Sequence, residues 1–383
     1  MKILMFSTDY HPDSGGIAKH IYYLSRALYA EGEDLTLIGG HRTLMTDTRR
    51  DAPFQEITLH RTGPKGWRSL KFLSDSFMVL KTLSSESWDV IHFHNFYLDG
   101  ILLGWLNWPK TKIRIMTNHS SLLLNRLDHK KRLTDLRLVT HKVDGFITPS
   151  RELQEKTHQL VNRNIPVEYI ANGVDTERFA PILDKFNYQL SPSPQLGRKI
   201  ILAVRRHEYK CGIHILIQAW PKVIQYYPDA LLWLIGEGDQ TTHLKKMVHD
   251  LNLGNSVSFL GTISHEALPS YYHSAYVSVL PSIYEAVSLS GLESLACGCP
   301  VVGTNVGGIP EFLKHKKTGL LVEANSVSGL ASALINLLGN SVERDKMGSV
   351  GSDYVKNNFS WSIAAKKTIS FYQRMIDLKL CVE

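Results

Sequence analysis

The sequence has few cysteines and no long apolar run, and each shortage excludes a class of protein. No apolar run approaches the roughly 20 residues that a bilayer-crossing helix needs, so we expect no transmembrane segment. Only four cysteines occur in 383 residues, and they form no metal-ligand pattern. Cys297 and Cys299 are expected to be small buried residues. We therefore predict a reduced, cytoplasmic protein whose first residues, MKILMFS, form a strand and not a signal peptide.

Signatures of nicotinamide cofactors and nucleic acids are also missing. Gly15 and Gly16 follow the first expected strand without the G-x-G-x-x-G of nicotinamide-binding domains, which argues against a dehydrogenase. Paired glycines at a helix start still let a phosphate approach the backbone N–H groups, because no Cβ intervenes. The net charge of +7 is modest for this length, and no known nucleic-acid-binding module appears. We expect no nucleic-acid partner.

Basic residues concentrate in one stretch, between Arg126 and Lys142. Leucines are interleaved with them, so the spacing predicts a basic amphipathic helix. Two interpretations stay open: a solvated helix face over a buried leucine stripe, or a surface for anionic lipid or an acidic acceptor. The second interpretation would bring the protein to the inner face of the membrane by peripheral contact.

Strand and helix patterns alternate along both halves of the chain, which predicts parallel sheets covered on both faces. The length suits two domains, and periodicity is lost in the Ser-, Pro- and Gly-containing residues 188–198, the expected linker. We therefore predict an α/β protein with two Rossmann-like, doubly wound domains that face a cleft. The expected strands are residues 2–7, 35–40, 89–94, 113–119, 144–150, 167–173, 199–204, 231–238, 257–261, 276–280, 300–305 and 319–323.

Two glutamates eight residues apart, Glu285 and Glu293, flank an expected strand-to-helix junction. Glu285 falls in the loop at the carboxyl end of the strand, where open α/β sheets bind ligands, and Glu293 falls on the helix. The N–H groups of Leu289 and Ser290 open this helix and can hold an anion. An anion cradle between two carboxylates suits a nucleotide-sugar, with the diphosphate in the middle, the sugar on one side and the ribose on the other.

Cations and histidines follow other expected strands. Arg205 and Lys210 lie just past a strand and before a helix, where two cations can neutralise a diphosphate and stabilise charge as it leaves. Arg206 is an alternative phosphate ligand. Histidines end two strands of the first half, and each has a structural interpretation as a hydrogen-bonded residue and a functional one beside a reaction centre: His92, His94 and His119.

These segments together resemble the retaining glycosyltransferases of the two-Rossmann-domain (GT-B) type, in the glycosyltransferase family 4 or group 1 class. The E-x7-E run of that family matches at Pro281, Ser282, Glu285, Leu289, Glu293, Ala296, Gly298, Pro300 and Val301. Its GG-x-x-x-H-x-x-x-L pattern matches at Gly16, His20 and Leu24, and its G-R-L-x-x-x-K-G element at Arg205 and Lys210. Weaker matches cover residues 170–181, 234–244, 257–275 and 304–322, so the resemblance spans nearly the whole chain.

The resemblance implies different roles for the two domains. Residues 1–187 would form an acceptor-side domain and residues 199–360 a nucleotide-sugar-binding domain, with a helix in 361–383 crossing back to the first. The loop with Gly15 and Gly16 would close over the donor diphosphate, His119 would contact the transferred sugar, and the backbone from Gly261 to Ile263 would meet the base. The acceptor side is assigned to His94 and Asn118, and donor contacts to Ser288, Leu289 and Ser290. The chain departs from the family at Ala286, Val287 and Ser288, beside the sugar pocket.

The expected reaction is transfer of a hexose or N-acetylhexosamine with retention of anomeric configuration. A UDP-sugar is favoured over a GDP-sugar by family frequency, and the acceptor is left open among a lipid-linked intermediate, a saccharide and a small molecule. Because no D-x-D motif occurs, we expect no divalent metal at the diphosphate and no cofactor. Glu285 is predicted to hold sugar hydroxyls and Glu293 the ribose. Two alternatives remain: a sugar-nucleotide epimerase of the same fold, and a catalytically silent nucleotide-sugar-binding partner.

Overall fold

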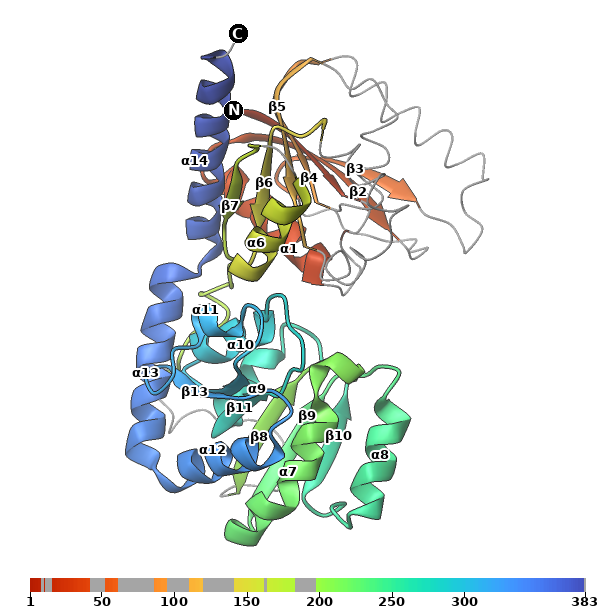
Figure 1. The fold of residues 1–383 in the computed structure, drawn as a ribbon, viewed down its shortest axis with the longest axis vertical. Helices are drawn as coiled ribbons and strands as arrows, with labels where there is room; N and C mark the ends of the chain where they lie inside the picture. Colours follow the sequence, from red (N-terminus) through yellow and green to blue (C-terminus); the bar gives the residue numbers. More distant parts are fainter. Residues whose placement is uncertain are drawn as a thin grey trace. The chain divides into compact units, whose positions relative to one another are not determined.

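The computed structural model describes residues 1–7, 10, 16–41, 52–60, 86–94, 110–119, 141–161, 164–182 and 198–381. Internal contacts divide the chain into two compact units, and Figure 1 shows both. The first unit combines Met1–Gly173 with Trp361–Glu383, and the second is Val174–Ser360. Gly15, the expected linker up to residue 197 and the expected basic helix up to residue 140 lie outside the described residues.

The first unit contains a parallel sheet of seven strands in the order β3-β2-β1-β4-β5-β6-β7. The strand order reverses between β1 and β4, and this reversal is the switch point at which open α/β sheets bind ligands. Six of the strands were predicted, and the edge strand β3 was not. Their bounds are β1 Lys2–Ser7, β2 Asp34–His41, β3 Gln55–His60, β4 Trp88–Phe93, β5 Thr111–Thr117, β6 Gly145–Thr148 and β7 Val167–Tyr169.

Alternation along the strands sorts the core of the first unit into two faces. Ile3 and Met5 of β1 pack with helices α1 (Gly16–Ala30) and α14 (Trp361–Leu380), whereas Leu4 and Phe6 pack on the opposite face with α6 (Arg151–Val161). Figure 1 shows α14, in dark blue, alongside the strands of this sheet. The last helix therefore belongs to the first unit, although it follows the second unit in the sequence.

The second unit contains a parallel sheet of six strands in the order β10-β9-β8-β11-β12-β13, with its switch point between β8 and β11. All six strands were predicted from their apolar runs. They are β8 Lys199–Val204, β9 Ala230–Ile235, β10 Val257–Gly261, β11 Val277–Leu280, β12 Val301–Thr304 and β13 Gly319–Val322. A 3-10 turn, Tyr209–Cys211, follows β8. The helices are α7 Ile213–Tyr226, α8 Thr241–Asp250, α9 Leu268–Ser274, α10 Leu289–Ala296, α11 Ile309–Phe312, α12 Val327–Gly339 and α13 Ser341–Asn358.

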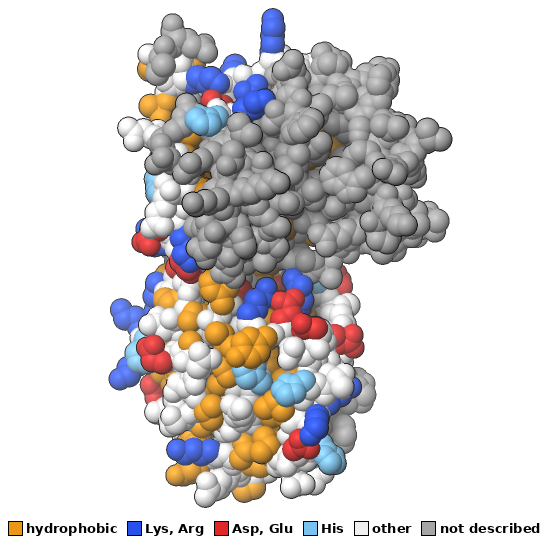
Figure 2. All heavy atoms as spheres, turned by 45° about the vertical axis from the view of Figure 1, so that its right-hand side comes forward, with side chains coloured by type: hydrophobic (Ala, Val, Ile, Leu, Met, Phe, Trp, Pro, Cys, Tyr) orange, Lys and Arg blue, Asp and Glu red, His pale blue; other side chains and the backbone are white. Residues whose placement is uncertain are grey.

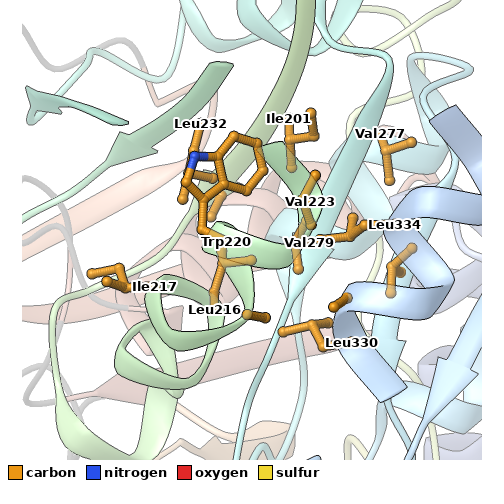
Figure 3. Packing of buried hydrophobic residues seen from close by; sticks show 14 of the residues in the cluster. Ile201, Leu216, Ile217, Trp220, Val223, Leu232, Val277, Val279, Leu330 and Leu334 are labelled. Atoms are coloured by element: carbon orange, nitrogen blue, oxygen red, sulfur yellow. The ribbon is translucent and has the colours of Figure 1, made fainter. Parts of the chain in front are cut away.

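Trp220 of α7 lies in the apolar core cluster of the second unit (Figure 3). It is fully buried, and its indole Nε1 donates a hydrogen bond to Ser256 Oγ at 3.0 Å. Leu330 and Leu334 of α12 join the same cluster, so α7 and α12 cover one face of this sheet. The strand ends that carry polar groups are thus anchored on a closely packed support.

None of the helices in the described part of the chain combines the length and the apolar content that a bilayer crossing requires. On the face of the second unit shown in Figure 2, acidic, basic and histidine side chains are mixed with hydrophobic ones.

Candidate functional site

An ion pair lies at the switch point of the second unit. Arg205 directly follows β8, and Glu285 lies in the loop after β11; because β8 and β11 are neighbours, their carboxyl ends meet at one place. The Arg205 guanidinium pairs with the Glu285 carboxylate, donates to Ser282 Oγ at 2.8 Å and to Ser288 Oγ at 3.3 Å. The structure therefore brings three of the predicted donor residues together: Arg205, Glu285 and Ser288.

This pair is shielded from water, since only 9% of the Arg205 side chain and 15% of the Glu285 side chain are exposed. Burial alone would lower the pKa of Arg205, but Glu285 and Cys211 together outweigh burial and hold that pKa above its ordinary value. Nε of Arg205 is buried and has no hydrogen-bond partner among the described residues. A buried cationic donor without an acceptor favours an anionic ligand such as a phosphate oxygen.

Gly212 allows the two loops of this site to pack closely against each other. Gly212 has φ +69°, and a Cβ at this position would lie 1.8 Å from the carbonyl oxygen of Pro281, so only glycine fits. The carbonyl oxygen of Lys210 accepts hydrogen bonds from the backbone N–H groups of Ile283 at 2.8 Å and of Tyr284 at 3.3 Å. These contacts hold the 3-10 turn and the loop after β11 in register, which sets Arg205 opposite Glu285.

The second predicted cation lies at the edge of this arrangement. The Lys210 ammonium is half exposed and pairs with Glu208 at 3.0 Å, not with Glu285. Arg206, the alternative phosphate ligand, is 68% exposed and pairs with the same Glu208 at 2.9 Å. Arg205 is thus the buried cation of the site, and its two basic neighbours point to solvent.

The first turn of α10 adds backbone donors beside Arg205. Ser288 caps this helix, because its Oγ accepts a hydrogen bond from the Gly291 N–H at 3.3 Å. Leu289 and Ser290 begin the helix, where the N–H groups have no acceptor within the helix itself. An anion at this position would meet the positive end of the helix dipole together with a buried guanidinium.

Glu293 is buried on α10 and is already bonded to two side chains. His265 Nε2 lies 2.8 Å from its Oε1, and the Tyr272 hydroxyl donates to its Oε2 at 3.2 Å. Burial and the nearby Glu293 carboxylate raise the pKa of Tyr272 well above its usual value. A ribose at Glu293 would have to share this carboxylate. Neither His265 nor Tyr272 was predicted as a partner of Glu293, because no motif marks these residues within the expected loop and helix.

Gly261 and Ile263, the predicted base contacts, lie at the carboxyl end of β10. Gly261 has φ +68°, and its carbonyl oxygen accepts a hydrogen bond from the Gly236 N–H at 2.8 Å. Since β9 separates β10 from β8, these residues occupy the same edge of the sheet two strands away from Arg205.

Histidines gather at the carboxyl edge of the first sheet. His92 is the penultimate residue of β4, and His94 follows the strand on the same face. His119 follows β5, and His20 comes from the second turn of α1. His94 Nδ1 and His119 Nε2 are 3.5 Å apart, and the ring centroids of His20 and His119 are 4.4 Å apart. Only His94 and His119 were assigned to the site from the sequence; the structure adds His20 to them.

These imidazoles are neutral near pH 7. Burial lowers the pKa of His20 to about 4. Burial, reinforced by the neighbouring histidines, also holds the pKa values of His94 and His119 well below the usual range. Neutral imidazoles offer a lone pair to a hydroxyl or a metal ion, which a charged imidazolium does not.

Three other predicted residues of the first unit have different surroundings. His92 is fully buried, with Nε2 2.7 Å from Thr117 Oγ1 and Nδ1 2.5 Å from the Tyr372 hydroxyl, so it fastens α14 to the sheet. Asn118 is also fully buried and donates through Nδ2 to Thr157 Oγ1 of α6 at 2.9 Å. Gly16 is the exposed first residue of α1.

Comparison with known families gives a match for each unit. Residues 186–353 match the family described as Glycosyl transferases group 1. Residues 14–178 match the family described as Glycosyltransferase Family 4. The two matches contain the residues singled out above, including Arg205, Glu285 and His119.

Individual relatives agree with these families. An uncharacterized glycosyltransferase of Methanocaldococcus jannaschii is 28% identical over 99% of this chain and 99% of its own length. A GDP-mannose-dependent phosphatidylinositol monomannoside mannosyltransferase of Mycobacterium tuberculosis is 32% identical over 54% of this chain and 55% of its own. Among solved structures, that of Anabaena HepE in complex with UDP superposes with a TM-score of 0.78 at 18% identity, covering 98% of this chain and all of HepE. The last comparison supports the fold.

Proposed function

The chain belongs to the group 1 glycosyltransferases and has their GT-B fold, and on this basis we propose its reaction. A hexose or N-acetylhexosamine passes from a nucleotide-diphosphate sugar to an acceptor hydroxyl, with retention of anomeric configuration. The bond from the anomeric carbon to the phosphate oxygen breaks, and a bond to the acceptor oxygen forms on the same face. The leaving phosphate takes the acceptor proton, so the products are the glycosylated acceptor and the nucleoside diphosphate.

The observation that carries this proposal is the buried Arg205 with an unused donor beside the start of α10. Its Nε has no partner among the described residues, while the other nitrogens hold Glu285, Ser282 and Ser288. A diphosphate seated here would be neutralised by Arg205 and the N–H groups of Leu289 and Ser290, with Lys210 at the outer edge. Because the chain has no D-x-D motif, this neutralisation is proposed to proceed without a bridging metal and without a cofactor.

The remaining roles are assigned around this anion site. Glu285 holds hydroxyl groups of the transferred sugar, since it is oriented by Arg205 and lies only 15% exposed at the strand end. Glu293 holds the ribose and shares its carboxylate with His265 and Tyr272. His119 remains the residue of the first unit proposed to contact the sugar, by resemblance to the family.

We propose a UDP-sugar as the donor. HepE, which shares the fold, was solved with UDP, whereas a relative covering about half of this chain is named for GDP-mannose. The acceptor is proposed as a lipid-linked, saccharide or small-molecule hydroxyl in the cytoplasm, at the inner face of the membrane if the residues between Arg126 and Lys142 contact lipid.

The test is acceptor-dependent release of nucleotide from a panel of UDP- and GDP-sugars, with Glu285→Gln as the diagnostic variant. We expect this variant to lose roughly 100-fold in turnover, on the scale of one lost transition-state contact, and to bind UDP as the wild type does. Glu266→Gln, at a 72% exposed carboxylate of the same unit, is the matched control and should keep normal turnover.

The outcomes separate the alternatives. Near-normal turnover in Glu285→Gln would refute the role of Glu285. Conversion of the sugar nucleotide without an acceptor would establish the epimerase instead. Binding of nucleotide-sugars without turnover on any acceptor would point to the catalytically silent partner.

A further inference from the structure

Three histidines of the first unit offer nitrogen atoms to one common point. The ligand atoms of His20, His94 and His119 all lie within 4.8 Å of one another. The three residues come from α1 and from the ends of β4 and β5, so the fold and not a local motif brings them together. In a tetrahedral zinc site with Zn–N of about 2.1 Å, ligand nitrogens are roughly 3.4 Å apart, so no two nitrogens need to approach each other by more than about 1.4 Å.

The contacts around this cluster show which ring nitrogens are available as ligands. His94 Nδ1 lies 3.5 Å from His119 Nε2, a contact that ligation through His119 Nε2 would replace. His20 Nδ1 lies 2.8 Å from Asn172 Oδ1, and because that oxygen only accepts, Nδ1 carries the proton and Nε2 carries the lone pair. Nε2 of His20 and Nε2 of His94 are both buried without a hydrogen-bond partner among the described residues. In zinc sites, a ligand histidine usually donates the N–H of its other ring nitrogen to an oxygen, which fixes the tautomer.

We propose that His20, His94 and His119 form a binding site for a divalent transition-metal ion of the zinc class, which ties α1 to the ends of β4 and β5. Three neutral imidazoles favour zinc, copper or nickel over magnesium or calcium, which prefer oxygen ligands. The site differs from the diphosphate site of the second unit. It shares His94 and His119 with the proposed acceptor and sugar contacts, so a bound ion would compete with those contacts.

His92 is excluded from the ligand set although its ring is 4.0 Å from that of His94. Both of its nitrogens are engaged, one by Thr117 and one by Tyr372. The same reasoning explains why the metal would bind at one edge of the histidine group and leave the α14 anchor intact.

The experiment is calorimetric titration of the full chain with Zn²⁺ after chelator treatment, using protein purified without a polyhistidine tag. We expect one ion per chain with micromolar or tighter affinity, and visible absorption of tetrahedral cobalt when Co²⁺ replaces Zn²⁺. His20→Gln and His119→Gln should each weaken binding by at least tenfold. His249→Gln, at a histidine that is 89% exposed, is the matched control and should bind as the wild type does.

A second variant guards against loss of fold. His119→Cys keeps a ligand at the half-buried position and should bind Co²⁺ with a new thiolate-to-metal charge-transfer band, which a packing role for His119 does not predict. Absence of stoichiometric Zn²⁺ binding would overturn the proposal. So would binding that survives His20→Gln and His119→Gln, or equal binding of Mg²⁺.

Discussion

The two units repeat one sheet plan, yet the groups at their switch points differ in charge. In the second unit, the ends of β8 and β11 carry a buried ion pair between Arg205 and Glu285. In the first unit, His94 follows β4 at the switch point and His119 follows the neighbouring strand β5; burial holds the pKa values of both well below the usual range. The topology thus fixes where ligands bind, whereas a few side chains at the strand ends decide which kind of ligand is favoured.

The difference also shows how each edge satisfies its buried polar groups. In the second unit, the guanidinium and carboxylate neutralise each other and leave one N–H donor of Arg205 for an anion. In the first unit, two buried imidazole nitrogens are left as acceptors, which suits a cation or a hydroxyl. The carboxyl edge of the second sheet therefore favours a phosphate, and that of the first sheet favours a cation or a hydroxyl group.

The largest effect should come from Gly212→Ala, which disrupts the close packing of the 3-10 turn against the loop after β11. A Cβ would lie 1.8 Å from the Pro281 oxygen in a residue at φ +69°, so we expect a loss of roughly 3 kcal/mol in the free energy of unfolding. Gly254→Ala is the control, because a Cβ there meets nothing within 4 Å. Urea denaturation measures the free energy of unfolding of both variants. Equal values would show that the close approach of Gly212 to Pro281 is not needed for stability.

Tyr372→Phe tests the hydrogen bond between α14 and His92 in the first unit. Removing the hydroxyl that lies 2.5 Å from His92 Nδ1 leaves a buried imidazole nitrogen without its partner, at a cost of about 2 kcal/mol. Tyr354→Phe, at a partly buried tyrosine of the second unit, should change the free energy of unfolding much less. A loss in Tyr372→Phe no larger than that in Tyr354→Phe would contradict the anchoring role of His92.

Ser288→Ala separates helix capping from ligand binding. Ser288 and Ser326 both cap helices by accepting from an N–H three residues later, at 3.3 Å and 3.1 Å, but only Ser288 also contacts Arg205. Each change to alanine should cost about 1 kcal/mol of stability, and only Ser288→Ala should weaken UDP binding, by isothermal titration. If Ser326→Ala weakened UDP binding equally, the contact with Arg205 would not matter.

The smallest effect concerns pH and His207, two residues after Arg205. Burial lowers the pKa of His207, an effect that Glu237 opposes, so the unfolded chain takes up a proton at a higher pH than the folded chain does. Stability should therefore fall as the pH drops below about 6.5. His207→Gln should reduce the slope of stability against pH, measured by urea denaturation, and an unchanged slope would contradict this assignment.

Much of the fold was predictable because buried parallel strands are continuous apolar runs. β8 (KIILAV) and β9 (ALLWLI) are examples, and all six strands of the second unit were identified in this way. β3 (QEITLH) was missed because an edge strand is partly solvated, and its polar residues hide the pattern. The position of α14 in the first unit came from family resemblance, since no local pattern says where a terminal helix packs.

The site residues could be predicted only where a local motif marks them, and the contacts between distant segments could not. Arg205, Glu285 and Ser288 were named from local motifs, but their direct bonds join residues about 80 apart in the chain. The same limit explains why the ion pair between Lys210 and Glu208 was not predicted. It also explains why the contacts of Glu293 with His265 and of His20 with Asn172 were missed.

The central claim is that the buried Arg205, and not its exposed neighbour, holds the donor diphosphate. Isothermal titration with UDP of Arg205→Gln against Arg206→Gln tests it most directly, with the double variant Arg205→Gln/Glu285→Gln included so that no unpaired carboxylate remains buried. We predict that both variants lacking Arg205 bind UDP at least tenfold more weakly, about 1.4 kcal/mol, and that Arg206→Gln binds it normally. Wild-type affinity in the variants lacking Arg205 would contradict the claim.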